Sequence, residues 1–411
     1  MSDLHVYIQH GWRNLWLYPL RTGLTVAALA LGIAALTFLS AMNDGWVHQT
    51  KTNFAMLLMG HVQVHADGFE KSRKLTEHIK APGLITSQLA SESVVVGWTK
   101  RVRVSGLAST AVANSGVRVF AIEPGREKEF THIPKFVKQG RWLTKDDDHA
   151  VLLGEGLADR LHAELGGKVI LMAVLSNGDI ASEVFRVKGI LYSGVLDIDN
   201  FAAIIPLGTA QRWLDLKEAV TDIVIFARDF SSVQPLVTAL RERFSDKGLE
   251  VLSWSDIDPF AKETVQFADV SSWVILSIVI FVVMVEVLNT MLMSLHERTR
   301  ELGMMGALGV THRQIFAMIL WETLILVVIG SVLGFILGAW VSAYFGEHGI
   351  DLSRYAVAFS FAYMEPVMYP RLFLESALEI IGVAAIGAVL AGLYPAWQAA
   401  KLDPAVAMRK I

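Results

Sequence analysis

The chain has 411 residues, of which 53% are hydrophobic and 18% charged, a composition that excludes an ordinary soluble enzyme and indicates a membrane protein. Its small net charge of −4 argues against nucleic acid as a partner. Because it contains no cysteine, disulfides and thiolate metal sites are excluded, and no metal site is expected.

Four apolar runs are long enough to cross a hydrocarbon core of about 30 Å, which takes roughly 20 helical residues. They are residues 24–42, 273–293, 315–345 and 372–393. Residues 1–23 combine aromatic and basic side chains in a pattern typical of an amphipathic helix at the membrane interface. More than 20 residues precede the first run, so we expect a retained membrane helix and not a cleaved signal peptide.

Arginine and lysine gather on one side of these runs. They lie before the first run, between the second and third (residues 294–314), and after the fourth (residues 394–411). The positive-inside rule therefore predicts that both termini and residues 294–314 are cytoplasmic. Residues 43–272 and 346–371 then face outward, the first as a large domain and the second as a loop.

The outer segment, residues 43–272, alternates strand-like and helix-like runs. Several strand-like runs, such as RVRVS at 101–105, have a period of two, and helix-like runs include residues 231–244. We expect an α+β domain with a strand-rich middle inserted between two α/β flanks. His61 and His65 share one strand face but lack nearby further ligands, which favours a solvated strand face over a metal site.

Two helical stalks are predicted to join the outer domain to the membrane. Asp258 has the features of an N-cap and Pro259 those of a first helical residue, and no glycine or proline follows until after Leu302. An unbroken helix of about 45 residues would be roughly 65 Å long, about twice the hydrocarbon thickness. A helix interrupted at residues 270–272 is the alternative. After the first span the chain can stay helical until Gly60.

The cytoplasmic segment, residues 294–314, is charged and rich in glycine. Opposite charges three residues apart support a solvated helix end, and Leu295, Leu302 and Met305 form an apolar stripe beside them. Three glycines permit a sharp turn, and Thr311 with Gln314 forms a capping box that starts the third span. Topology alone accounts for the arginines, but not for the acids, the glycines or the stripe.

We therefore predict that residues 294–314 form a short amphipathic docking helix. Its candidate coupling residues are Glu297, Arg298, Arg300, Glu301, Leu302, Gly303, Gly306 and Gly309. Three polar residues inside the spans are further candidates, namely Glu286, Asn289 and Glu322. Because polar groups at that depth are costly, they are expected to form an interhelix hydrogen bond, a conformational gate or a titratable relay.

The same segment carries a family resemblance. NTMLMSLHERTRELGMMGALGVTHRQI, with Glu322 and the later GSVLGFILG, resembles the FtsX-like domain of ABC-transporter permeases typified by MacB, FtsX, LolC and LolE. The resemblance extends to HGWRNLWLYPLRTGLTVAALALGIA at the start, to VLLGEGLADRLHAELGGKVIL and IPLGTAQRWL in the outer segment, and to YPAWQAAKLDPAVAMRK at the end. It covers nearly the whole chain in the right order.

The resemblance implies a four-helix permease whose second-to-third loop is the coupling helix of a cytoplasmic ATPase dimer. ATP-driven closure of the ATPases would move the membrane helices and, through them, a periplasmic domain of "porter" and "sabre" subdomains. This is termed mechanotransmission. The sequence has no complete P-loop, HExxH or GxSxG motif, which predicts a non-catalytic subunit that leaves ATP and Mg to a partner ATPase.

The resemblance also implies a second permease chain, identical or paralogous, in the inner membrane of a diderm bacterium. ERTRELG is nearer to the MacB and FtsX pattern, whereas the large outer domain and the lack of an ATPase within these residues favour the lipoprotein-type arrangement. We expect extraction of lipoproteins or other amphiphiles, handed to a periplasmic chaperone or adaptor. Efflux of small amphiphiles or peptides through an adaptor, and signalling to a cell-wall hydrolase, are the alternatives.

Overall fold

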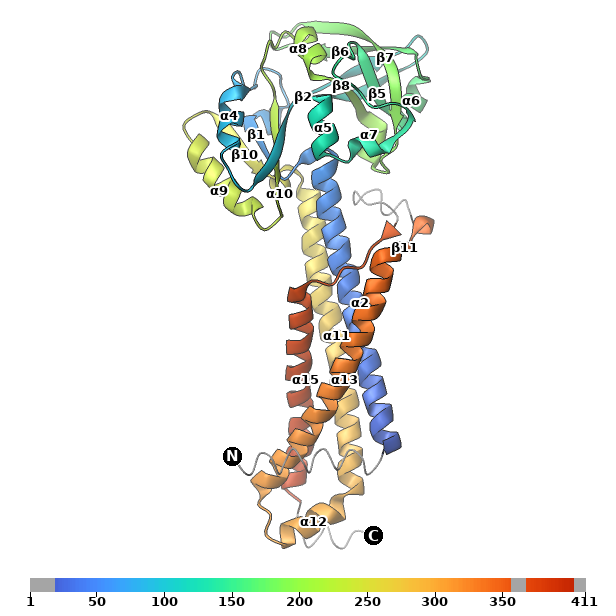
Figure 1. Ribbon diagram of the computed structural model, residues 1–411, viewed down its shortest axis with the longest axis vertical. Coiled ribbons are helices and arrows are strands. Elements are labelled where there is room, and N and C mark those ends of the chain that lie inside the picture. Colours follow the sequence, from blue (N-terminus) through green and yellow to red (C-terminus); the bar gives the residue numbers. More distant parts are fainter. Residues whose placement is uncertain (1–18, 356–366, 403–411) are drawn as a thin grey trace. The chain divides into compact units, whose positions relative to one another are not determined.

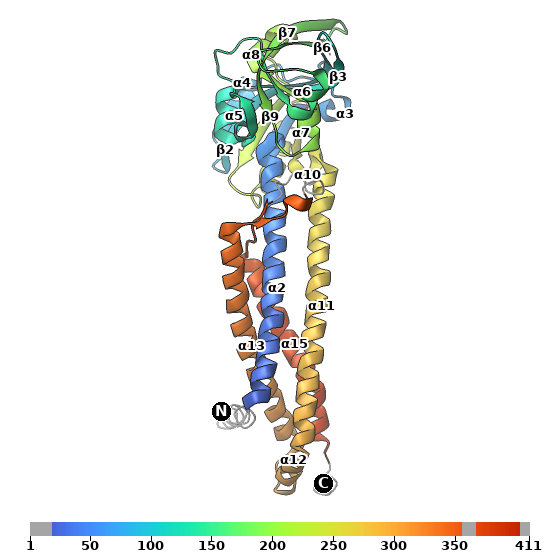
Figure 2. The same cartoon turned by 90° about the vertical axis from the view of Figure 1, so that its right-hand side faces the viewer.

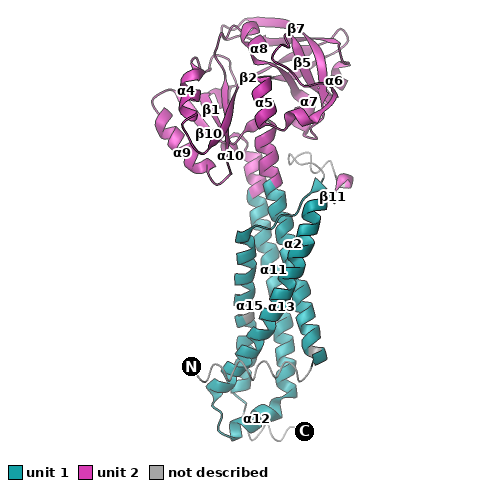
Figure 3. Cartoon of the chain, viewed as in Figure 1, with its two compact units in different colours: residues 1–48, 266–351, 367–411 teal, residues 49–265, 352–366 magenta. Residues whose placement is uncertain are grey.

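The computed structural model describes residues 19–355 and 367–402, which fall into two compact units (Figure 3). Unit 1 consists of residues 1–48, 266–351 and 367–411, and unit 2 of residues 49–265 and 352–366. Most of the predicted interfacial helix, the middle of the predicted outer loop and the last residues of the predicted cytoplasmic tail lie outside the described residues.

Long helices dominate unit 1, and four of them are long and apolar enough to cross a membrane. They lie lengthwise beside one another in Figure 1 and in the turned view of Figure 2. Their bounds, with those of the short helix α12, are α2 (Pro19–Phe54), α11 (Pro259–Glu297), α12 (Thr299–Ala307), α13 (His312–His348) and α15 (Leu374–Ala400).

These helices pass beyond the predicted limits of the spans. α2 has no break at residue 23 or 42 and continues into five π-helical residues, Ala55–Met59, before Gly60 (φ 69°) ends it. α15 runs on past residue 393 and includes Pro395. The difference has a physical reason: an apolar run marks only the part of a helix that lies in lipid, whereas backbone hydrogen bonds continue until a cap or turn stops them. The predicted outer loop contains a two-stranded ladder of β11 (Ile350–Asp351) and β12 (Val367–Met368).

A seam of glycines brings α13 against α2. Gly330, Gly334 and Gly338 are spaced four residues apart and are all buried. A Cβ atom added at Gly334 would meet the Ala30 carbonyl oxygen at 2.5 Å, and one at Gly338 would meet the Ala34 carbonyl oxygen at 2.7 Å. Small residues at this spacing allow membrane helices to pack backbone against backbone.

We expect Gly334→Val to separate α13 from α2 and to cost about 1–3 kcal/mol of stability, because the backbone facing it cannot yield. SDS-induced unfolding of the helices in micelles, followed by circular dichroism, measures the loss. Gly382→Val in α15 is the matched control, since a Cβ there meets nothing within 4 Å. Equal losses for the two variants would contradict the seam.

Unit 2 is built on one mixed sheet of ten strands, with eight short α-helices and the 3-10 helix η2 (Ile133–Phe136) among its described residues. The strands are β1 (Val62–Ala66), β2 (Val95–Ser109), β3 (Asn114–Ile122), β4 (Val137–Gly140), β5 (Ala150–Gly154), β6 (Lys168–Val174), β7 (Ile180–Leu191), β8 (Ala202–Pro206), β9 (Asp222–Ala227) and β10 (Leu249–Ser253). The helices are α3 (Phe69–Ser72), α4 (Pro82–Leu89), α5 (Pro124–Phe130), α6 (Glu155–Leu161), α7 (Leu196–Phe201), α8 (Leu207–Trp213), α9 (Val233–Phe244) and α10 (Trp254–Ile257).

The sheet order is β10-β1-β9-β2-β3-β8-β5-β7-β4, with β6 pairing β2 and β7. The long strand β2 joins the two parts of this order, because its first half pairs with β9 and its second half with β3 and β6. The strand-rich middle lies between the two flanks, as predicted, but it continues their sheet and forms no sheet of its own. One hydrogen-bonded sheet runs through it and both flanks.

Charged side chains are buried on β2. Arg101, 1% exposed, donates from Nε to Oε1 of the fully buried Glu127 at 2.6 Å and from Nη2 to Oε2 at 2.9 Å. Arg103 Nε donates to Asp222 Oδ1 at 2.7 Å, and His65 Nδ1 lies 2.9 Å from the same oxygen. Each buried charge is thus compensated by an opposite one, as burial away from water requires.

The expected solvated face of His61 and His65 is wrong. The two residues are 2% and 0% exposed, because β1 is a central strand between β10 and β9. His61 packs against the Phe230 ring at 4.6 Å between centroids and accepts a hydrogen bond from Ala227 N at 3.3 Å. The described residues hold no group of three metal-ligating side chains.

The stability of unit 2 is expected to fall as the pH drops from about 6.5 to about 4. Burial lowers the pKa of His61 to about 4, with Asp229 opposing weakly. In this window the unfolded chain takes up a proton that the folded chain does not, so up to roughly 3 kcal/mol is lost. Hydrogen exchange of the β1 amides, corrected for intrinsic rates, measures it. His61→Gln should remove this step and exposed His162→Gln should not; a step that survives His61→Gln would contradict the assignment.

Candidate coupling site

The predicted continuous helix from Pro259 to Leu302 is interrupted once. Asp258 caps its start, accepting at Oδ1 from Phe260 N at 2.9 Å and from Ala261 N at 3.2 Å. The helix then continues through residues 270–272 to Glu297, and Arg298 (φ −102°, ψ 13°) separates it from α12. The stalk helix therefore has 39 residues, about 58 Å at 1.5 Å per residue.

The break at Arg298 turns its guanidinium inward. Nη1 donates to both oxygens of Glu322 on α13, at 3.2 and 3.1 Å, and Nε donates to Glu301 Oε2 at 3.3 Å. The Arg298 and Glu322 side chains are each 6% exposed. We predicted Arg298 as a residue that couples to the ATPase. In the structure it is one half of a buried ion pair that joins α11 and α12 to α13.

The apolar stripe also faces inward. Leu295 and Leu302 are 3% and 1% exposed and belong to one core cluster with Ile315 and Ile319 of α13, against which Met305 also packs. Leu302, predicted to contact an ATPase, is therefore part of the core that holds α12 to the helices. Apolar side chains on the membrane side of a charged segment are better covered by the adjoining helix than left in water.

Only one of the three glycines makes the turn. Gly303 and Gly306 lie within α12, and Gly303 is buried there, whereas Gly309 (φ 95°) follows its end. Thr311 and Gln314 then form the expected capping box: Thr311 N donates to Gln314 Oε1 at 2.8 Å, and Gln314 N to Thr311 Oγ1 at 3.4 Å. The positive φ of Gly309 suits glycine because glycine has no Cβ.

Fewer of the predicted coupling residues are therefore exposed to a partner than expected. We define the α12 surface as Arg300, Glu301, Met304 and Leu308, all exposed, with Leu308 the most exposed at 86%. It combines one positive charge, one negative charge and two unbranched or γ-branched apolar side chains. Glu297 is also exposed, at the end of α11. Sequence reasoning missed Leu308, although its place directly before Gly309 marks it as a helix-end residue.

The other polar candidates within the spans are not part of this site. Glu286 is half-buried and Asn289 exposed on α11, and no hydrogen bond or ion pair joins either of them to another side chain among the described residues. Glu322 alone is brought to the coupling segment. Of the roles left open for it, a structural link between helices is the one its contacts with Arg298 fit.

Comparisons with known proteins match two families to this chain. Residues 273–404 match the FtsX-like permease C-terminal family, and residues 22–243 match the MacB-like periplasmic core domain family. A pyoverdine export ATP-binding/permease protein, PvdT, of Pseudomonas fluorescens is 25% identical over 98% of this chain and 59% of its own length. A macrolide export ATP-binding/permease protein, MacB, of Bdellovibrio bacteriovorus is 22% identical over 100% of this chain and 62% of its own length. The chain thus spans about three fifths of these relatives.

One relative has a similar length. The uncharacterized ABC transporter permease YvrN of Bacillus subtilis is 25% identical over 98% of this chain and 99% of its own length. Among solved structures, the periplasmic region of MacB from Actinobacillus actinomycetemcomitans is 18% identical, with a TM-score of 0.36, over 50% of this chain and 92% of that one.

Proposed function

Since the chain belongs to the MacB-type ABC transporter permeases with an FtsX-like C-terminal domain, we propose that it converts ATP hydrolysis on a separate cytoplasmic ATPase into movement of its outer unit. The observation that carries the proposal is the Arg298–Glu322 pair, which fixes the exposed α12 to two membrane helices at once. A load applied to α12 is then transmitted and not absorbed by a loose loop.

The proposed path starts at the α12 surface. Closure of an ATPase dimer pushes on Leu308 and its neighbours, and the buried core around Leu302 passes the displacement to α11 and α13. α11 has no break from Glu297 back to Pro259, and its residues 259–265 belong to unit 2. One continuous helix is the stiffest connection that a chain can make between two units, because every backbone group is hydrogen-bonded within it.

The assembly that we propose has two permease chains and two ATPase chains, with ATP and Mg bound by the ATPases. It lies in the inner membrane of a diderm bacterium with both termini in the cytoplasm. A periplasmic chaperone or adaptor receives the cargo. The alternation of basic and acidic segments along the sequence supports this orientation.

For the cargo, we propose extraction of a lipoprotein or another amphiphile from the membrane. A cavity of about 60 Å³ in unit 1 supports it. Three membrane helices line this cavity: Leu36 and Leu39 come from α2, Trp273 and Leu276 from α11, and Glu379 from α15. Ser40, Ser272 and Ser376 also line it, so this small cavity offers polar atoms for a head group next to apolar side chains.

Export of a small molecule is the second candidate, and the names of two relatives favour it. One is called a pyoverdine exporter and the other a macrolide exporter. Signalling to a cell-wall hydrolase stays a prediction that no observed feature favours.

The proposal is tested by isolating the full-length chain from its own cells under mild conditions. An ABC ATPase should co-purify, and its hydrolysis rate should depend on the permease. A stable chain that recovers no ATPase would contradict the coupling. A lipid-modified protein bound in the absence of ATP supports extraction, whereas a bound soluble molecule supports export.

A further inference from the structure

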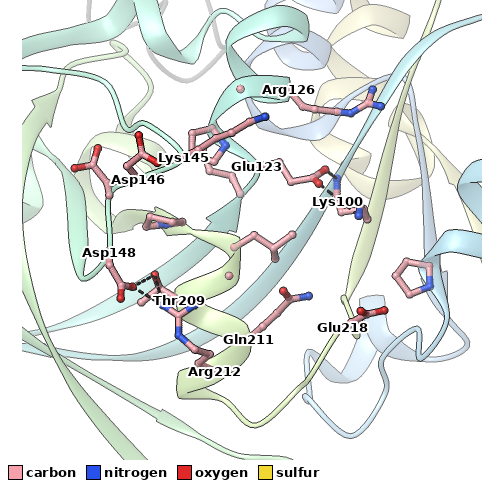
Figure 4. A pocket seen from close by; sticks show the side chains of 18 of the residues that line it. Lys100, Glu123, Arg126, Lys145, Asp146, Asp148, Thr209, Gln211, Arg212 and Glu218 are labelled. Carbon is pink, nitrogen blue, oxygen red and sulfur yellow. Dashed lines mark hydrogen bonds and ion pairs between the residues drawn. The ribbon is translucent and has the colours of Figure 1, made fainter.

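Unit 2 contains an open cleft of about 780 Å³ at the ends of the strands β3 and β8. β3 and β8 are parallel neighbours, with Ile122 opposite Pro206, and both end in the cleft. α5 follows the end of β3 and α8 the end of β8, while Lys100 of β2 and residues 145–148 line the other sides (Figure 4). The carboxyl ends of parallel strands are the usual place for ligands in such sheets, because the following chain segments diverge there.

The walls of the cleft are held in place by internal pairs. Asp148 accepts from Thr209 Oγ1 of α8 at 2.6 Å and also pairs with Arg212, which ties residues 145–148 to α8 (Figure 4). The hydrogen bond from Thr209 holds the pKa of Asp148 below its ordinary value, with Arg212 adding to the effect. Lys100 Nζ lies 3.4 Å from Glu123 Oε1. These charges are satisfied within the chain.

Four other charges of the lining have no ion-pair partner among the described residues: Arg126, Lys145, Asp146 and Glu218. Arg126 is held in position, since its guanidinium carbon lies 4.8 Å from the Trp98 ring centroid and its Nη1 donates to the Trp98 carbonyl at 3.3 Å. In Figure 4, Arg126 and Lys145 lie on one side of the cleft, and Glu218 with Gln211 on the opposite side. Asp146, next to Lys145 in the chain, carries the opposite charge but forms no ion pair with it, so Arg126 and Lys145 both stay available on this side.

The size and the lining restrict the ligand. A volume of this order is that of pockets for small molecules, which range over about 300–1,000 Å³. Such pockets are mostly apolar, whereas charges surround this one, so it disfavours an acyl chain and suits a polar solute. Unpaired charges of opposite sign on opposite sides complement a molecule with a carboxylate at one end and an ammonium at the other.

We propose that this cleft binds a zwitterionic, peptide-like solute, with its carboxylate at Arg126 and Lys145 and its ammonium at Glu218. Gln211, beside Glu218, donates with Nε2 to the Ala219 carbonyl at 3.1 Å, which leaves Oε1 to accept from a peptide N–H. This inference rests on the second candidate of the proposed function, export of a small molecule, and it names the chemical class that unit 2 accepts. A guanidinium already fixed on an aromatic ring loses little conformational freedom when it binds a carboxylate.

The test uses the full-length chain in phosphatidylcholine nanodiscs and tetra-alanine with free termini as the probe, with binding measured by calorimetry. Arg126→Gln should weaken binding roughly tenfold and Glu218→Gln to a smaller extent, because each removes one charge-assisted contact. Lys128→Gln and Glu129→Gln, exposed on α5 but outside the cleft, are the matched controls and should bind as the wild type does.

Modified probes identify the end that each side binds. The C-terminally amidated peptide should bind the wild type as weakly as the free peptide binds Arg126→Gln, and should lose little more on that variant. The N-acetylated peptide should show the same relation to Glu218→Gln. Absence of peptide binding to the wild type, or full binding by Arg126→Gln, would overturn the inference. If peptide binding fails but the ATPase still co-purifies and depends on the permease, only the inference about the cleft is refuted. If the peptide binds but no ATPase co-purifies, only the proposed function is refuted.

Discussion

Glu322→Gln is expected to destabilise the helical unit by about 3–5 kcal/mol, because it leaves the Arg298 guanidinium buried without its counter-charge. Glu322 accepts two hydrogen bonds from Arg298, and each side chain is only 6% exposed. Glu301, the second partner of Arg298, lies at 3.3 Å but is 52% exposed. Glu301→Gln is therefore the control, and we expect it to cost no more than about 1 kcal/mol.

A double variant separates the loss of the charge from the loss of packing. Arg298→Met with Glu322→Met replaces the pair by apolar side chains of similar length, so most of the lost stability should return. SDS-induced unfolding followed by circular dichroism gives the free energies of unfolding of the wild type and the three variants. If Glu322→Gln costs no more than Glu301→Gln, the pair does not hold α12 to the membrane helices.

Leu308→Asp is expected to abolish coupling to the ATPase without unfolding the chain. Leu308 is 86% exposed at the end of α12, where a large apolar side chain gains nothing in water. In the proposed interface Leu308 is a central apolar contact. Its exchange for a carboxylate should therefore reduce both co-purification of the ATPase and permease-stimulated ATP hydrolysis by roughly tenfold or more. Arg300→Glu should weaken the same contact by reversing a charge at its edge.

The matched control is Leu84→Asp, which places the same change at an exposed leucine of α4 in unit 2. It should leave ATPase binding and hydrolysis unchanged. Gel filtration and thermal unfolding of each variant show that the fold is kept. Normal ATPase stimulation by Leu308→Asp would exclude the α12 surface as the docking site.

Local signals predicted much of the membrane unit. Asp258 caps α11, and Thr311 with Gln314 caps α13, because capping depends on residues within one helical turn. The roles of Arg298 and Leu302 could not be read in the same way. An amphipathic pattern shows that a helix has two faces, but which face meets a neighbour depends on α13, and Glu322 is 24 residues away.

The outer unit shows the same limit. The run RVRVS at 101–105 lies in β2 and predicted a strand by its alternation, whereas β5 and β8 are buried at every position and resemble any short apolar segment. The cleft could not be foreseen at all. Arg126 and Glu218 are 92 positions apart in the sequence, and only the pairing of β3 with β8 and the packing of α8 place them around one space.

Movement of unit 2 driven by nucleotide on the partner is the central claim, and a distance measurement tests it most directly. Because the chain has no cysteine, spin labels at Ser87→Cys in unit 2 and Glu347→Cys in unit 1 are unique. In the complex with the ATPase, a non-hydrolysable ATP analogue should shift the distance distribution between the labels, and Leu308→Asp should abolish the shift. A distribution unchanged by the analogue, or a shift that survives Leu308→Asp, would contradict the account.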